Sequence, residues 1–542
     1  MEPATIPAAV AHAAWEFADK PALAEPGGPR ITYGELHERV VTVARALIAG
    51  GVAPGDRVAI WSPNTHHWVL GALGALHAGA VLVPVSTRFT GHEALDVIGR
   101  SGARALIAAG PFLGTDRLAA LRAAAEDAQR GPAGPGPGRL SLIVRVPIEA
   151  GGAGPPGQGA DGAGGAIGWD ELPGRAAAVP AGVAAERAAA VSPEHVSDIM
   201  FTSGTTGRSK GAMTAHRQSL AVARAWAECG GLSSADRYLV VNPFFHSFGY
   251  KAGILACLVS GATLVPQLIY DAGRAMALVE AERITVFPGP PTIYQTILDH
   301  PGRGTHDLSS LRLAVTGAAA VPVALVERMR QELSFESVLT AYGLTEAVVA
   351  TMCRPGDDPP TVARTSGRAA AGFEVRIAGP DGRGAAPGET GEILLRGPNL
   401  MLGYLDDEEA TRAAIDAGGW LHTGDVGQLD PRGYLTITDR LTDMYICGGF
   451  NVYPAEVEQV LARLDGVAES AVIGVADARL GEVGRAYVVA RAGHALDAGK
   501  VLAFCRERLA NYKVPRQVVF RDCLPRNPAG KVLKRRLREE AT

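Results

Sequence analysis

The sequence predicts an α/β protein with a large, layered N-terminal domain and a smaller C-terminal α+β domain. From Ala8 to about Gly110, helical periodicity alternates with short apolar runs. Val40 to Ile48 and Trp68 to His77 are periodic, and Arg57 to Trp61 between them has the pattern of a strand. Such alternation is typical of helices packed on a sheet. The chain has 542 residues, more than one hydrophobic core usually organises, so two or more domains are expected.

The domain boundary is predicted just after Gly433 to Asp443, where a short alternating strand ends in charged residues. We assign residues 1–441 to the N-terminal domain and residues 442–542 to the C-terminal domain. In the C-terminal part, helices are expected at Pro454 to Leu464 and Asp497 to Leu509, and strands at Ala471 to Val475 and Ala486 to Ala490. This mixture indicates a small α+β unit.

Glycine, alanine and proline dominate the segment from about residue 131 to 180, for example in Gly151 to Gly157. A segment of this composition cannot bury enough apolar surface to become ordered. We expect a flexible surface insertion in the N-terminal domain, with a functional lid as the alternative.

Composition and charge exclude several classes of protein. The net charge of −4 and the pI of 6.4 indicate neither a nucleic-acid partner nor an acidic membrane partner. The N-terminus lacks the pattern of a signal peptide. The most hydrophobic run, Val69 to Val85, contains His77 and Pro84 and predicts a buried helix followed by a strand rather than an integral membrane segment. The six cysteines are scattered without a C-x-x-C pair, which indicates a reducing, cytoplasmic setting.

The stretch from Thr202 to Gly211 is the strongest candidate for a binding loop. Its glycines let backbone amides approach an anion, and its hydroxyl groups and Lys210 add donors and positive charge. The expected ligand is therefore a polyphosphate. The spacing differs from the Walker pattern. We predict that the loop joins the strand at Asp198 to Phe201 to a helix that begins near Thr214. A polar surface loop is the alternative.

Other polar residues lie in loops or near predicted strand ends, and each has a simpler explanation when it is considered alone. His246 lies in an aromatic segment, Asn242 to Lys251, which suits either a pocket wall or the core. Glu346 follows a predicted strand and could hold Mg²⁺ beside phosphates, or be a solvated surface residue. Asp425 could bind vicinal hydroxyls or stabilise a turn. Lys531 lies in a Pro/Gly turn before a basic tail, where most lysines are simply solvated.

Taken in order, five motifs resemble those of the adenylate-forming superfamily, which includes acyl-CoA synthetases, adenylation domains of peptide synthetases and beetle luciferases. They are TSGTTGRSKG, YGLTE, TGD, DRLTDMYICGGFNVYPAEVE and PRNPAGK. The resemblance extends from about Thr32 to Leu537. It implies an AMP-forming ligase in which a carboxylic acid and ATP give an acyl-adenylate and pyrophosphate, and CoA then gives the thioester and AMP. ATP, Mg²⁺ and CoA are the implied cofactors.

The resemblance also implies roles for individual residues. Thr345 would contact the phosphate, His246 would lie between nucleotide and acyl pocket, and Lys531 would be the adenylation lysine; with Glu346 these form the catalytic set. The phosphates would be wrapped by Thr202, Ser203, Gly204, Thr205, Thr206, Gly207 and Lys210. Adenine would be held by Gly317, Ala318, Tyr342 and Gly343, ribose by Asp425 and Arg440, Mg²⁺ by Glu346 and Thr202, and pantetheine by Gly448, Gly449 and Phe450.

The pivot position between the two domains, usually Lys or Asp in the superfamily, is Thr442 here. We expect the hinge to be retained without a specific charge contact.

Several segments, such as Ile60 to Thr65 and Phe248 to Gly253, look closest to actinobacterial CoA ligases of steroid-ring catabolism. Those enzymes activate an indanedione propanoate, HIP. A medium- or long-chain fatty acid is the main alternative substrate. An enzyme that loads a carrier protein and a nucleotide-binding regulator without catalysis are the alternatives from other classes. A homodimer stays open.

Overall fold

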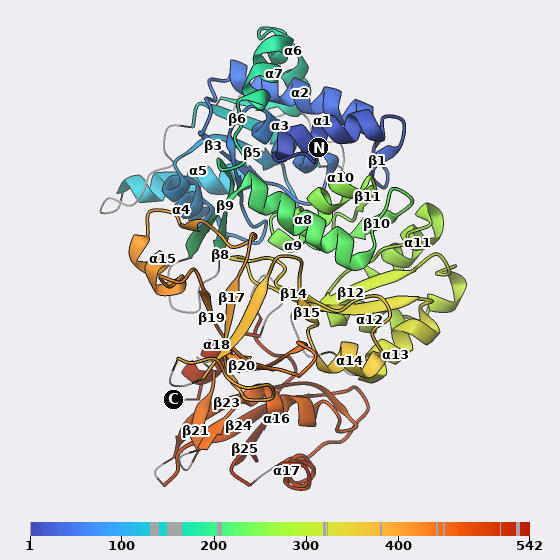
Figure 1. Ribbon diagram of the computed structural model, residues 1–542, viewed down its shortest axis with the longest axis vertical. Coiled ribbons are helices and arrows are strands. Elements are labelled where there is room, and N and C mark those ends of the chain that lie inside the picture. The colour runs from blue at the N-terminus through green and yellow to red at the C-terminus, as the bar shows by residue number, and fades with distance from the viewer. Residues whose placement is uncertain are drawn as a thin grey trace.

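The structure is a computed structural model that describes residues 2–130, 140–148, 165–202, 209–317, 321, 323–379, 382–440, 443–447, 450–477, 479–509, 511–526 and 532–541. Figure 1 shows a long molecule in which the N-terminal half forms one end and the C-terminal hundred residues, in red, form the other. The mixture of helices and sheets confirms the predicted α/β class.

The largest sheet has eight strands in the order β18-β9-β8-β4-β3-β5-β6-β7. Its central strands, β3 (Arg57–Trp61), β4 (Val81–Pro84) and β5 (Ala103–Ala109), are almost completely buried and parallel. The remaining strands are β6 (Leu142–Val146), β7 (Ala166–Gly168), β8 (Val196–Thr202), β9 (Lys210–Ala215) and β18 (Gly403–Tyr404). Continuous apolar runs suit such strands because helices cover both faces of a parallel sheet.

Two four-stranded sheets lie next to each other, and Val286 joins them by forming parallel bridges to Tyr238 and Leu313. The first has the order β10-β11-β1-β2 and the second β12-β13-β14-β15. Their bounds are β1 (Pro21–Ala24), β2 (Arg30–Thr32), β10 (Arg237–Val240), β11 (Thr263–Pro266), β12 (Leu313–Gly317), β13 (Ser337–Tyr342), β14 (Thr351–Met352) and β15 (Arg368–Ala369).

Helix α3 (His66–His77) lies at the centre of the N-terminal core. All of its residues except His66 are buried, and it is followed directly by β4, which confirms the predicted buried helix and strand at Val69 to Val85. Around this core lie α1 (Ile6–Glu16), α2 (Tyr33–Ala49), α4 (Gly91–Ser101), α5 (Arg117–Arg130), α6 (Leu172–Ala176), α7 (Ala181–Ala189), α8 (His216–Gly230), α9 (Ser247–Gly249), α10 (Ala256–Ser260), α11 (Ala272–Glu282), α12 (Pro291–Leu298), α13 (Val323–Glu332) and α14 (Pro359–Arg364). No helix of the described residues is long and apolar enough to cross a membrane.

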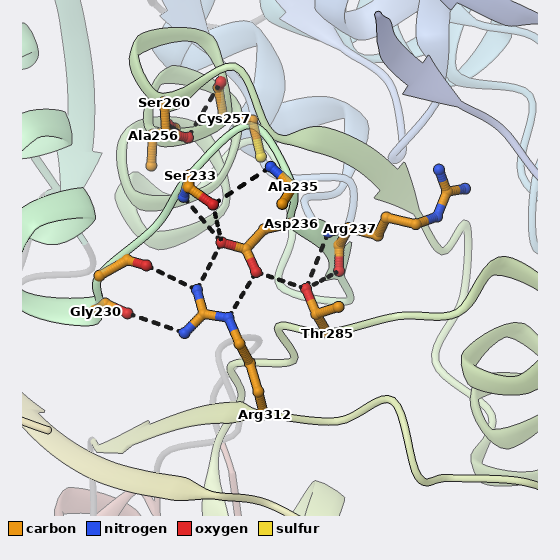
Figure 2. A network of polar contacts seen from close by, with 11 residues as sticks. Gly230, Ser233, Ala235, Asp236, Arg237, Ala256, Cys257, Ser260, Thr285 and Arg312 are labelled. Atoms are coloured by element: carbon orange, nitrogen blue, oxygen red, sulfur yellow. Dashed lines mark hydrogen bonds and ion pairs between the residues drawn. The ribbon is translucent and has the colours of Figure 1, made fainter.

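A buried carboxylate joins the starts of β10 and β12. Arg312 donates to both oxygens of Asp236 at 2.7 and 2.6 Å, and Thr285 donates to Oδ1 at 2.8 Å (Figure 2). Burial raises the pKa of Asp236, but the hydrogen bonds from Arg312, Ser233 and Thr285 outweigh this effect and hold the pKa below its ordinary value. The carboxylate therefore stays charged and links β10 to β12 where the two sheets meet.

Two further sheets complete the molecule. One has the order β16-β17-β19-β20, and the other contains β22-β21-β24-β23 with β25 beside β24. Their strands are β16 (Glu374–Ala378), β17 (Gly391–Arg396), β19 (Leu421–Leu429), β20 (Leu435–Arg440), β21 (Tyr445–Cys447), β22 (Phe450–Val452), β23 (Val467–Asp477), β24 (Gly481–Ala490) and β25 (Gln517–Phe520). The helices here are α15 (Glu408–Ala414), α16 (Pro454–Leu461), α17 (Ala498–Arg506) and α18 (Lys534–Glu539). The helices and strands predicted for the C-terminal part are all present, with shifted ends.

The prediction of a flexible insertion at residues 131–180 is wrong for the parts that the structure describes. β6 and β7 extend the large sheet in parallel register, and α6 follows. Alternate residues of β6 point to the same face of the sheet, and on this face Leu142 and Val144 are buried in the main core. This short apolar stretch buries enough side-chain surface to form a strand beside β5. The Gly/Pro-rich sequence around it, by contrast, predicts a flexible segment. Residues 131–139 and 149–164 lie outside the described part of the chain.

Candidate functional site

The predicted phosphate loop connects the two strands of a hairpin rather than a strand and a helix. Thr202 ends β8 and pairs with Lys210, the first residue of the antiparallel strand β9, so the prediction that the loop leads directly to a helix is wrong. Helix α8 begins only after β9. Arg100 of α4 holds the base of the loop: its Nη1 donates to the Ser209 carbonyl at 2.7 Å, and its guanidinium lies 5.1 Å from the centre of the Phe201 ring. Residues 203–208 lie outside the described part of the chain.

Tyr404 contacts both Glu346 and Lys210, although the sequence provides no reason to expect it at the site. Tyr404 Oη donates to Glu346 Oε1 at 2.8 Å, and Lys210 Nζ lies 5.0 Å from the centre of the Tyr404 ring. Burial and the charge of Glu346 raise the pKa of Tyr404, so its hydroxyl stays a donor at any physiological pH. No local pattern indicates Tyr404, because it reaches the site through the pairing of β18 with β9.

A second group of predicted residues lies at the ends of β13 and within β19. Tyr342 is 9 % exposed, and its hydroxyl donates to Asp425 Oδ2 at 2.6 Å. Asp425 lies opposite Arg440 in the pairing of β19 with β20. The two residues expected at ribose are therefore neighbours in the sheet. Asp425 lies within the strand β19.

The loop after β13 and the neighbouring end of β12 are tightly packed. In the loop, a Cβ atom on Gly343 would lie 1.7 Å from the Val348 carbonyl oxygen. At the end of β12, a Cβ atom on Gly317 would lie 2.5 Å from the Ala341 oxygen of β13. Val348 has a φ of 61°, which is unfavourable for a β-branched residue. Thr345 and Glu346 are half-buried in this loop. Such strain is most common at functional sites, and here it shapes the loop that carries four predicted site residues, Tyr342, Gly343, Thr345 and Glu346.

His246 follows β10 and lies in a different segment from the residues above. Its Nδ1 accepts a hydrogen bond from the Phe248 amide at 3.2 Å, so the neutral ring carries its proton on Nε2. Desolvation by the surrounding protein lowers the pKa of His246 below its ordinary value. His246 is therefore neutral at physiological pH. It could donate a hydrogen bond through Nε2 to a ligand.

The segment after His246 is fastened to the strand that carries the phosphate loop. A π-helix, η2 (Tyr250–Leu255), contains Lys251, whose Nζ lies 2.9 Å from Asp198 Oδ1 of β8. Both side chains are fully buried. Ser197 and Ser219 donate to Asp198 Oδ2 at 2.7 and 2.9 Å. The aromatic residues of this region, such as Phe244 and Tyr250, belong to the core.

The remaining predicted residues lie outside the described part of the chain or are described by their backbone alone. Ala318, Thr442, Gly448, Gly449 and Lys531 lie outside the described residues. For Arg440 and Phe450 only the backbone is described, and Phe450 pairs with Cys447 in a hairpin. On either side of the segment that contains Lys531, Arg526 and Val532 form an antiparallel bridge.

The described site offers hard oxygen ligands and hydrogen-bond donors rather than a metal cluster. Within the described residues there is no group of three or more histidine, cysteine or acidic side chains that could hold a metal ion. Glu346, with one oxygen bound to Tyr404, can offer Oε2 to a cation, and Thr202 ends the strand before the phosphate loop. Such a donor set suits Mg²⁺, which binds through one or two protein oxygens and substrate phosphates.

The fold and this arrangement define a nucleotide-dependent, adenylate-forming enzyme. Residues 10–405 match the family described as AMP-binding enzyme, and residues 456–531 match the AMP-binding enzyme C-terminal domain. The chain therefore belongs to the AMP-binding enzyme family.

Among its relatives are two proteins that share one name, 3-[(3aS,4S,7aS)-7a-methyl-1,5-dioxo-octahydro-1H-inden-4-yl]propanoyl:CoA ligase. The one from Rhodococcus jostii (strain RHA1) is 59% identical over 539 residues, which cover 99% of each chain. The one from Mycobacterium tuberculosis (strain ATCC 25618 / H37Rv) is 59% identical over 536 residues and covers 99% of this chain and 98% of its own. Long-chain-fatty-acid–CoA ligase FadD13 from the same strain is 34% identical over 511 residues, 94% of this chain and 93% of its own.

Among solved structures, ATP-bound MatB from Rhodopseudomonas palustris has a TM-score of 0.82 at 29% identity and covers 99% of both chains. These findings confirm the predicted class: the protein is an AMP-forming acyl-CoA synthetase that uses ATP and CoA.

Proposed function

We propose that the acid activated by this enzyme is HIP, the fused-ring indanedione propanoate, and that the product is its CoA thioester. The observation that carries this proposal is the 59% identity, over 99% of the chain, to two proteins named for that reaction. The relative named for long-chain fatty acids is 34% identical, so a fatty acid is the second candidate.

The two-step reaction follows from the chemistry of a carboxylate. A carboxylate is a poor electrophile because it is anionic and has no good leaving group. Its attack on the α-phosphate of ATP supplies a leaving group but brings negative charge toward negative charge. The phosphate loop, Mg²⁺ held by Glu346, and Lys531 would neutralise this charge in the transition state.

The chain passes from one sheet to another close to the predicted domain boundary at residues 441 and 442, and this change supports alternation between the two half-reactions. β20 ends at Arg440 in one sheet, and β21 begins at Tyr445 in another. We propose that rotation about Thr442 withdraws Lys531 after adenylation. Gly448, Gly449 and Phe450 then line the path of the pantetheine thiol. Gating by domain motion of this kind is common in enzymes.

We also propose a reducing, cytoplasmic location. None of the six cysteines forms a disulfide, and all except Cys523 are buried. A homodimer is the proposed alternative to a monomer, to be settled by measuring the mass in solution.

The substrate is tested with a panel of acids that contains HIP, hexanoate and palmitate, assayed with ATP, Mg²⁺ and CoA by mass spectrometry of the thioester and AMP. We expect the highest kcat/KM for HIP. A higher value for palmitate would replace HIP by a fatty acid. Turnover only with a phosphopantetheinyl carrier protein would indicate a carrier-loading enzyme, and ATP binding without pyrophosphate release would indicate a regulator.

A further inference from the structure

Tyr404 lies where three distant segments of the chain meet. Its hydroxyl donates to Glu346 in the loop after β13, and its ring faces Lys210 at the start of β9. Glu346 is the proposed magnesium ligand, and Lys210 the proposed phosphate ligand. One side chain therefore contacts two of the groups proposed to neutralise the charge of ATP.

The contact with Glu346 fixes the direction of the carboxylate. A hydrogen bond to a charged acceptor is short and strong, and here it occupies Oε1 at 2.8 Å. The other oxygen, Oε2, is then the one that can face a cation. The backbone reinforces this arrangement, because the Met401 amide donates to the Glu346 carbonyl at 2.8 Å. Glu346 is thus held through both its side chain and its main chain by the segment that ends in Tyr404.

The contact with Lys210 acts through the ring rather than the hydroxyl. An ammonium group within about 6 Å of an aromatic ring centre is attracted by the ring's negative face, and Lys210 Nζ lies at 5.0 Å. The lysine leaves β9 at the point where the phosphate loop returns to the sheet. The ring therefore holds the charge of Lys210 beside Tyr404 instead of in bulk solvent.

We propose that Tyr404 is a positioning residue that couples Glu346, the proposed Mg²⁺ ligand, to Lys210, the proposed phosphate ligand, so that the metal and the triphosphate bind as one unit. This inference rests on the proposed roles of Glu346 and Lys210. It assigns the hydroxyl to metal binding and the ring to nucleotide binding.

The backbone of this segment makes hydrogen bonds that do not involve the Tyr404 side chain. The Tyr404 amide donates to Thr411 Oγ1 at 2.8 Å, and β18 pairs with β9 through the main chain. Variants at this position should therefore keep the strand in place. Y404F removes only the hydroxyl, and Y404L removes the ring as well.

The experiment compares Y404F and Y404L with the wild type in two measurements. The first is the Mg²⁺ concentration for half-maximal pyrophosphate release, and the second is the Kd of ATP with and without Mg²⁺ by calorimetry. In Y404F we expect the half-maximal Mg²⁺ concentration to rise roughly tenfold, the size typical of losing a hydrogen bond to a charged group. The Kd of ATP without Mg²⁺ should stay unchanged in Y404F and rise in Y404L.

Tyr434 provides a matched control. Its hydroxyl donates to Asp357 at 2.6 Å, and the Arg432 guanidinium lies 4.7 Å from its ring centre, but none of these residues belongs to the proposed site. Y434F should keep the wild-type Mg²⁺ dependence.

Two failures can be told apart. An unchanged Mg²⁺ dependence in an active Y404F enzyme would overturn the role of Tyr404 and leave the ligase intact. A wild type that releases no pyrophosphate with any acid would overturn the proposed reaction. In that case, Mg²⁺-dependent binding of ATP that is weakened in Y404F would still support the positioning role.

Discussion

Gly343 shows that the site depends on a missing side chain as much as on those present. A Cβ atom there would overlap the carbonyl oxygen of Val348, which is already in a left-handed conformation at φ 61°. The loop therefore cannot accept a methyl group at Gly343 unless the backbone around Val348 shifts. Such a shift would displace Glu346, which lies between these two residues in the loop.

We expect Gly343→Ala to raise the KM for ATP and to lower the free energy of unfolding by about 1–3 kcal/mol, the usual cost of overpacking. Urea unfolding and the rate of pyrophosphate release measure the two effects. Gly182→Ala in α7 is the control, because a Cβ there meets no atom within 4 Å; it should keep the KM and raise stability by up to about 1 kcal/mol. Wild-type behaviour of Gly343→Ala would contradict the tight packing of this loop.

At the scale of elements, the ion pair between Lys251 and Asp198 connects η2 with β8. The pair is 2.9 Å apart and fully buried, and therefore costs desolvation that only the intact pair offsets. It fixes the segment that begins at His246 relative to the strand that ends at Thr202.

Lys251→Met should lower the free energy of unfolding by about 3–5 kcal/mol, because it leaves a buried carboxylate without its partner. Adding Asp198→Asn removes that charge while the amide oxygen can still accept from Ser197 and Ser219. We expect the double variant to regain most of the loss in urea unfolding. If it is as unstable as the single variant, the charge of Asp198 is not what makes the single variant unstable.

Helix α3 carries two histidines in apolar surroundings, and these affect stability in acid. Burial, and to a smaller extent the charge of a neighbouring histidine, lowers the pKa of His67 to about 3 and that of His77 to about 4. Because the ordinary pKa of about 6.5 applies in the unfolded chain, the unfolded state binds more protons below that pH. Stability is therefore highest above pH 6.5 and falls as the pH decreases towards 4.

For each of these histidines the free energy of unfolding should fall by about 2 kcal/mol between pH 8 and pH 5. His77→Leu should remove one such contribution and flatten the pH dependence of urea unfolding by that amount. His92, an exposed residue of α4, serves as the control in His92→Gln. An unchanged slope in His77→Leu would mean that His77 already takes up a proton in the folded protein.

At the scale of the whole molecule, the proposed catalytic lysine lies in the C-terminal part of the chain, whereas the proposed nucleotide site is built from residues between 202 and 440. α16 contacts β20, and the C-terminal helix α18 is tied to its own domain by Lys534–Glu458 at 2.9 Å and Arg538–Asp443 at 2.8 Å. These ion pairs hold α18 to the rest of the C-terminal part. We therefore expect this part to move as a unit in the proposed alternation.

Lys531→Ala should lower the rate of adenylate formation by ~10²–10³-fold, as loss of one charge-stabilising group does, and should spare thioester formation from a pre-made acyl-adenylate. Lys534→Ala is the matched control and should keep the adenylation rate. Thr442→Pro should leave adenylation intact and suppress thioester formation. Single-turnover assays of each half-reaction measure these effects; equal loss of both steps in Lys531→Ala would rule out the alternation.

The sequence by itself determined the protein's class, because the motifs of an adenylate-forming enzyme are short runs of neighbouring residues whose chemistry is visible without a fold. It also located most helices and strands, including α3 and β3, since periodicity is a local property. It failed where neighbours in sequence were misleading: Leu142 and Val144 form a core strand inside a Gly/Pro-rich stretch.

Only the tertiary structure decided which distant residues act together. Tyr404 meets Lys210 because β18 pairs with β9. Hydrogen bonds join Tyr404 to Glu346 and Tyr342 to Asp425. These contacts depend on strand pairing across about 60 to 200 residues of chain. The free energy of such pairing comes from the whole core rather than from a local pattern, and for this reason the sequence names the chemistry while the fold arranges it.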